Sequence, residues 1–171
     1  MKKINSLIIT IMIAATTGAM AQATSDPATS SATIVAPIGI TKAVDMNFGN
    51  VAVSSAGGTV IMTTAGATSI TGGVTLPNIT GTVTAASFDV TGEGNYTYSI
   101  TLPDGDEITL EDGDGSNSMT VDNFVSDPSD SGQLTTAAQT ISVGAILNVD
   151  GGQAAGTYTN ETDLTVTVNY N

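Results

Sequence analysis

The stretch "QTISVGAILNV" (Gln139–Val149) places an apolar residue at every second position from Ile141 to Val149. A period of two is the pattern of a β-strand with one buried face, because successive side chains of a strand point to opposite sides. The row predicted to be buried consists of Ile141, Val143, Ala145, Leu147 and Val149. We therefore expect a long strand here, with one face in the core of a β-sheet protein.

Short stretches with the same alternation recur along the chain, and glycine-containing turns separate them. "NYTYSITLP" places four apolar or aromatic residues on one face, namely Tyr96, Tyr98, Ile100 and Leu102. In "TVTAASFDVTG" the apolar row changes side, which predicts a bulge near Ala85 and Ala86 and lets one strand bend between sheets. No stretch sustains a helical period, so we expect an all-β fold: an antiparallel β-sandwich of about eight to ten short strands with Greek-key-like connections.

The N-terminal residues, "MKKINSLIITIMIAATTGAMAQA", place two lysines before an apolar stretch that ends in small residues. This is the pattern of a secretory signal peptide, and we expect residues 1–21 to be removed by cleavage after Ala21. The apolar stretch is too short, and too broken by Thr16, Thr17 and Gly18, to span the ~20 residues that a bilayer core requires. The sequence therefore predicts an exported protein of the periplasm, the cell surface or the extracellular space, without stable membrane insertion.

The mature chain begins with the small and polar residues 22–31, which predict a flexible leader before a single β-sandwich domain over residues 32–171. The domain opens with an alternating row that is predicted to face a core: Ala32, Ile34, Ala36, Ile38 and Ile40, continued by Val44, Met46 and Phe48. Pro37 lies on the opposite face, where its missing N–H requires an edge, a bend or a break. The domain closes with a second alternating row: Leu164, Val166, Val168 and Tyr170.

Charge and composition exclude several classes of function. After cleavage, Lys42 is the only basic residue against sixteen acidic ones, so phosphate backbones and anionic membrane surfaces are not expected as partners. The chain has no cysteine and no histidine, and it therefore lacks the usual nucleophile, general base and ligands of many enzymes and transition-metal sites. No phosphate-binding, dinucleotide-binding or serine-hydrolase motif is present, so we expect neither an enzyme nor a cofactor.

The acidic loop "LPDGDEITLEDGDGSNSMTVDN" is the strongest candidate for a ligand site. Asp112, Asp114 and Ser116 are spaced like the start of a calcium loop, and Asp104, Asp106 and Glu107 lie nearby. The match then fails, because asparagines occupy the positions of the turning glycine and of the bidentate glutamate. The interpretation that we favour is a set of Asp-Gly turns that close hairpins around "EITL", with weak Ca²⁺ binding as the alternative.

Three stretches together resemble a known family: "ATIVAPIGITKAVDMNFGNV" (32–51), "GTVTAASFDVTGEGNYTYSITLP" (81–103) with "MTVDNF", and "SVGAILNVDGGQAAGTYTNETDLTVTVNYN" (142–171). They are similar to the bacterial secreted domain-of-unknown-function family 4402. The ending, "AGTYT" followed by an alternating strand, is also similar to spore coat protein U domains and chaperone–usher pilins. That resemblance implies an immunoglobulin-like sandwich that lacks one strand, whose groove is filled first by a periplasmic chaperone and then by the N-terminal extension of the next subunit.

Two functions follow as expectations. The first is a non-catalytic, pilin-like structural or adhesive protein of the cell surface, assembled by β-strand addition through the two alternating rows. In that case the first row acts as the added strand, and the partners are a second copy or a chaperone. The second is a self-contained secreted binding module that takes Ca²⁺ or a glycan through its acidic loops. If the first row is instead the domain's own first strand, the sandwich is complete and needs no partner.

Overall fold

The structure is a computed structural model that describes residues 24–103 and 108–171. The predicted signal peptide lies outside the described residues, as do Asp104, Asp106 and Glu107. The chain divides into two compact units, Met1–Thr33 and Ile34–Asn171. In the first unit the described residues, 24–33, are exposed and form no strand. The second unit contains all the strands described below.

The described residues contain strands and no helix, and every strand pair is antiparallel. The strands are β1 (Gly39–Val44), β2 (Asn47–Phe48), β3 (Ala52–Met62), β4 (Thr68–Thr75), β5 (Val83–Thr84), β6 (Ala86–Thr91), β7 (Thr97–Thr101), β8 (Ile108–Glu111), β9 (Ser118–Asp127), β10 (Ser131–Gln133), β11 (Ala138–Val149) and β12 (Thr167–Tyr170). The expected all-β sandwich is confirmed. The strands outnumber the eight to ten expected, because short pairs such as β2 with β5 interrupt longer extended stretches.

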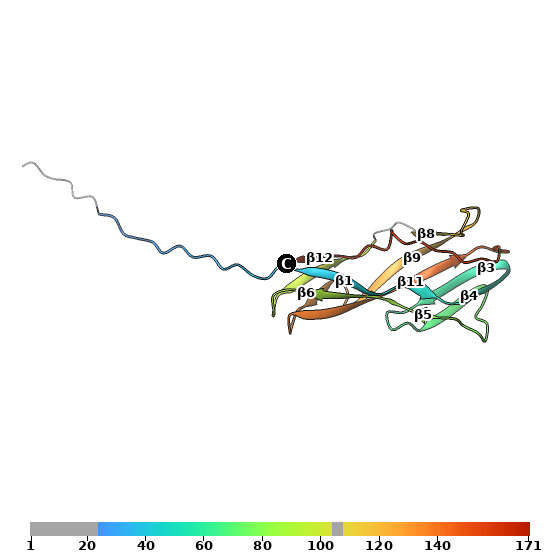
Figure 1. Ribbon diagram of the computed structural model, residues 1–171. Coiled ribbons are helices and arrows are strands. Elements are labelled where there is room, and N and C mark those ends of the chain that lie inside the picture. The colour runs from blue at the N-terminus through green and yellow to red at the C-terminus, as the bar shows by residue number, and fades with distance from the viewer. Residues whose placement is uncertain (1–23, 104–107) are drawn as a thin grey trace, which may run out of the picture. The chain divides into compact units, whose positions relative to one another are not determined.

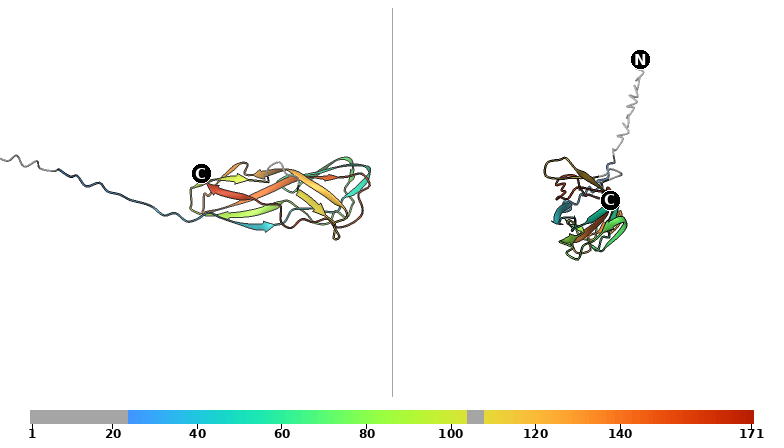
Figure 2. Two further views of the ribbon diagram at one scale, coloured as in Figure 1. Left: turned by 90° about the horizontal axis from the view of Figure 1, so that it is seen from above. Right: turned by 90° about the vertical axis from the view of Figure 1, so that its right-hand side faces the viewer.

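The large sheet has the order β1-β6-β11-β3-β4, with β9 on the other edge of β11 and β8 beside β9 (Figure 1). β6 pairs with the first half of β11 (138–143) and β3 with the second half (145–149), so these two strands share one edge of β11 in succession. A second sheet has the order β10-β7-β12, and β2 and β5 form a third. The red arrow that ends at the label C in Figure 2 is β12.

β11 supplies the centre of the core, as its alternation predicts. Its five odd-numbered residues from Ile141 to Val149 are all buried, at 5% exposure or less. The first half of β11 contributes to one apolar cluster, with Phe88, Val90, Tyr98 and Leu134, among others. The second half contributes to another cluster, with Val60, Met62 and Val121, among others. One strand therefore joins both halves of the core.

The predicted change of side near Ala85 is present as a break in the strand. β5 ends at Thr84 and pairs with β2, whereas β6 begins at Ala86 and pairs with β1 and β11. The extended chain thus leaves one sheet and enters another at Ala85. This is the bend that the change of parity predicts, because a single interrupted residue exchanges the two faces of a strand.

Two parts of the predicted buried rows are exposed, which corrects the sequence interpretation. Ala32, Ile34 and Ala36 are exposed, since β1 begins only at Gly39 and no strand pairs with the residues before it in the described chain. Ile38 and Ile40 do pack against the core, but Val44 is 41% exposed on the edge strand β1. Tyr96 is 43% exposed because it lies in the turn before β7, next to Asn95 with a φ of 66°.

Candidate functional site

The predicted C-terminal strand is shorter in the structure than its alternation suggests. β12 covers Thr167–Tyr170, whereas Leu164 and Val166 pack against the core without belonging to a strand. A turn delays the ladder: the Asn160 Oδ1 atom accepts hydrogen bonds from the backbone N–H groups of Thr162 (3.0 Å) and Asp163 (2.9 Å). Hydrogen bonds from Asn160 and Thr162 also hold the pKa of the Asp163 carboxyl below its usual range. All four residues of the predicted apolar row pack in or against the core, but only Val168 and Tyr170 belong to the strand that pairs with β7.

β12 is an edge strand, because β7 is its one partner among the described residues. The Asn171 N–H group donates to the Thr97 carbonyl (3.2 Å), so the odd-numbered residues of β12 direct their backbone groups toward β7. The backbone groups of Val168 and Tyr170 therefore point away from β7. β1 lies close to β12, but no ladder joins the two strands.

The N-terminal row is the second predicted part of the assembly site. Ile34 is 97% exposed, and Ala32 and Ala36 on the same row are exposed as well. The next two members, Ile38 and Ile40, pack against the first half of the core. The structure therefore divides the row into an exposed part that ends at Ala36 and a docked part that leads into β1.

Ala36, which precedes β1, makes hydrogen bonds to Tyr170 of β12 and to Glu93. The Tyr170 hydroxyl donates to the Ala36 carbonyl (2.9 Å), and the Ala36 N–H group donates to the Glu93 Oε2 atom (3.0 Å). The Glu93 N–H group in turn donates to the Tyr170 hydroxyl oxygen (2.6 Å). Tyr170 and Ala36 belong to the predicted rows. Glu93, which lies in the turn between β6 and β7, was not predicted, because no local pattern marks a partner 57 residues away.

Residues 112–117 of the acidic loop form the hairpin turn between β8 and β9. The Asp112 Oδ1 atom accepts from the N–H groups of Ser116 (2.9 Å) and Asn117 (3.2 Å), and its Oδ2 atom accepts from the Asn117 side chain (2.6 Å). The Ser116 N–H group also donates to the Asp114 Oδ1 atom (3.0 Å). These bonds, chiefly that from the Asn117 side chain, lower the pKa of the Asp112 carboxyl. The three calcium candidates are thus brought together, with the Asp112 carboxylate used inside the turn.

The described parts of the chain, 24–103 and 108–171, contain no group of three or more acidic, histidine or cysteine side chains placed to hold a metal ion. Within the same ranges no helix is long and apolar enough to cross a membrane.

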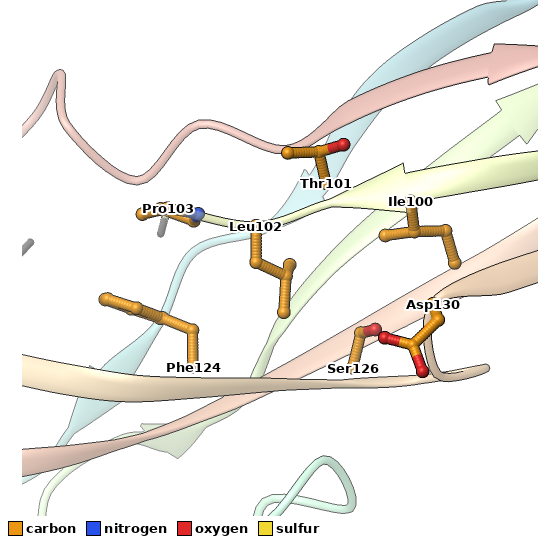
Figure 3. A pocket seen from close by; sticks show the side chains of 7 residues that line it. All are labelled: Ile100, Thr101, Leu102, Pro103, Phe124, Ser126 and Asp130. Carbon is orange, nitrogen blue, oxygen red and sulfur yellow. The ribbon is translucent and has the colours of Figure 1, made fainter. Parts of the chain in front are cut away.

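A hollow of about 300 Å³ lies between the end of β7 and β9 (Figure 3). Ile100, Leu102 and Pro103 line one side, while Phe124, Ser126 and Asp130 face them from the other. Its lining combines these apolar side chains with the hydroxyl groups of Thr101 and Ser126 and the carboxylate of Asp130. Its lining residues include neither Ala36 nor Tyr170.

One family model matches the chain: "Domain of unknown function (DUF4402)" matches residues 38–170. The match covers most of the chain, so the chain belongs to this family. It begins at Ile38, after the exposed part of the N-terminal row, and ends at Tyr170. No curated protein and no solved structure matches the chain.

Proposed function

We propose that this member of the DUF4402 family is a non-catalytic, exported structural or adhesive subunit of the cell surface that assembles by β-strand addition. The observation that carries the proposal is the state of Ile34, which is 97% exposed in a row of alternating apolar residues. A large aliphatic side chain gains free energy when a partner removes it from water. The segment that holds it has the period of a strand and no sheet of its own.

The added strand needs an edge with free backbone groups, and β12 offers one. The backbone groups of Val168 and Tyr170 point away from β7, and the apolar side chains of Val166 and Val168 already face the core. An added strand would extend the β10-β7-β12 sheet through backbone hydrogen bonds, and alternate side chains would set its register. Because β1 lies close to β12, such addition also requires β1 to shift.

The exposed segment is long enough for this role. Residues 24–35 precede the contacts of Ala36, and a chain of that length spans about 40 Å when fully extended. The free edge from Val166 to Tyr170 needs only about 17 Å of strand. A second copy could therefore donate the segment without unfolding its own β1.

The size distribution of the purified mature protein, residues 22–171, tests this proposal. We expect concentration-dependent oligomers in light scattering, and their loss in Ile34→Asp, because the substitution places a charge in the row that must be buried. Thr33→Asp is the matched control, since it adds the same charge to the opposite face of the same segment. A wild-type protein that stays monomeric at every concentration, or equal oligomerisation of the two variants, would contradict the proposal.

The second candidate function is a self-contained binding module, and the hollow between β7 and β9 favours it. Its lining combines apolar side chains with two hydroxyl groups, and the Asp130 carboxylate would favour a ligand with a hydroxyl or a positive charge. The calcium alternative is tested separately through the melting temperature. A melting temperature raised by millimolar Ca²⁺ in the wild type, and unchanged by Ca²⁺ in Asp112→Ala, would support it. No effect on either protein would reject it.

A further inference from the structure

β1 depends on a single ladder for its place in the fold. Among the described residues it pairs with β6 alone, and the pairing starts at Gly39 opposite Thr91. An edge strand of this kind can separate from its neighbour pair by pair, beginning at the end where the chain enters. The contacts that precede Gly39 therefore decide how easily β1 opens.

Ile38 packs against the core, and the hydrogen bonds that precede Gly39 are made by Ala36. This residue belongs to no strand, yet side chains bind both of its backbone polar groups: Glu93 accepts from its N–H group at 3.0 Å, and Tyr170 donates to its carbonyl at 2.9 Å. The two side chains come from the β6–β7 turn and from β12, and the backbone N–H group of Glu93 donates a hydrogen bond to the Tyr170 hydroxyl oxygen (2.6 Å). The segment before β1 is thus held by two separate parts of the fold.

Three features of the fold restrain the position of the Tyr170 hydroxyl. The backbone of Tyr170 is paired with Tyr98 in the β7–β12 ladder. Its ring lies 5.6 Å from the ring of Tyr96, at an interplanar angle of 60°. The hydroxyl sits over Gly92, where a Cβ atom would come within 2.2 Å of it, so only glycine leaves room for this contact.

We infer that Glu93 and Tyr170 form a latch on Ala36, which keeps β1 attached to β6 when the N-terminal segment moves or is pulled. A force on residues before Ala36 meets the latch first, and it reaches the Gly39–Thr91 pair only after both hydrogen bonds break. The latch bears on assembly, since a shift of β1 would open the edge of β12. It stands independently of strand exchange, because it concerns a single copy of the chain.

The sequence contains a probe for this opening. Lys42 is the only lysine of the mature chain, which has no arginine, so trypsin can cleave it only after Lys42. Lys42 lies inside β1, paired with Phe88, and cleavage requires the surrounding segment to leave the sheet. The rate at which trypsin produces the fragment 43–171 from the native mature protein therefore reports the opening of β1.

We expect Tyr170→Phe and Glu93→Ala to raise this rate about tenfold, as the loss of one or two hydrogen bonds would. Glu93→Gln keeps an acceptor oxygen for Ala36 and should cleave at a rate near that of the wild type. Tyr158→Phe is the matched control, since its hydroxyl donates to the Ala154 carbonyl (2.7 Å) in a loop remote in sequence from the latch. The wild-type rate should depend only weakly on urea, because opening β1 exposes less surface than global unfolding.

Two results would overturn the inference. One is a Tyr170→Phe rate no higher than that of Tyr158→Phe. The other is a urea dependence of the Tyr170→Phe rate that equals the dependence of global unfolding, which would mean that trypsin cleaves the unfolded chain. When the rates are measured at concentrations where each protein is monomeric, strand exchange does not contribute to them, so the latch and the proposed assembly can fail separately.

Discussion

β11 and the N-terminal row from Ala32 to Ile40 carry the same alternation of apolar residues, yet one is buried and most of the other is exposed. Ile141 in β11 is 0% exposed, whereas Ile34 is 97% exposed. β11 has β9 on one edge, β6 and β3 on the other, and a second layer over its apolar face. The N-terminal row has no such neighbours before Ile38. A period of two thus identifies the residues that share a face, while burial depends on what covers that face.

The largest expected effect tests this difference directly. Ile141→Ala should lower the free energy of unfolding by ~2–5 kcal/mol, because it leaves a cavity in a fully buried site. Ile34→Ala, the same substitution in the other row, should change it by less than ~0.5 kcal/mol. Urea denaturation of the monomeric proteins measures both values. Equal losses in the two variants would mean that the N-terminal row is packed against the domain.

The second prediction concerns the close packing around β11. A Cβ atom on Gly144 would lie 2.4 Å from the Met62 carbonyl oxygen, so Gly144→Ala forces β3 and β11 apart. We expect a loss of ~1–3 kcal/mol in unfolding free energy. Gly113 has nothing within 4 Å of its Cβ position, and Gly113→Ala should therefore be close to neutral. An equally neutral Gly144→Ala would show that the two strands can separate without cost, and that β11 is less tightly held than its burial indicates.

The smallest expected loss of stability concerns the buried hydroxyl group of Tyr98. The Tyr98 side chain is 0% exposed, and its hydroxyl donates to the Gln139 Oε1 atom of β11 (2.8 Å). Burial raises the pKa of Tyr98. The neutral phenol is thus favoured in the folded protein, and the stability that it contributes is complete below the unfolded pKa of about 10 and is lost as the pH rises through the higher folded pKa.

Tyr98→Phe removes the hydrogen bond to Gln139 and also the phenol group that loses its proton at high pH. At neutral pH the variant should be about 1 kcal/mol less stable than the wild type. Above pH ~10 the difference between the two proteins should shrink, because only the wild type loses the contribution of Tyr98. Thermal unfolding from pH 8 to pH 11 measures the difference, and a gap that stays constant or widens with pH contradicts the assignment.

The features that the sequence could predict are those set by neighbouring residues. The buried row of β11, the change of sheet at Ala85 and the hairpin turn at Asp112 all follow from local alternation or from turn residues. The exposure of Ile34 could not be predicted in this way, because it depends on the absence of a covering strand. The same holds for the bond between Tyr170 and Ala36, which joins residues 134 positions apart. The contact of Glu93 could not be predicted either, since a single acidic residue between two glycines is typical of a turn.

The position of β11 in the chain has a consequence for how the protein folds. β3, β6 and β9 all pair with β11, which begins only at Ala138. A chain that emerges from a ribosome with its N-terminus first therefore presents β3 and β6 well before their common neighbour, and β9 shortly before it. Both apolar clusters stay incomplete until residues 138–149 arrive, so the sheet must form late and through contacts between distant segments, which are slow to form.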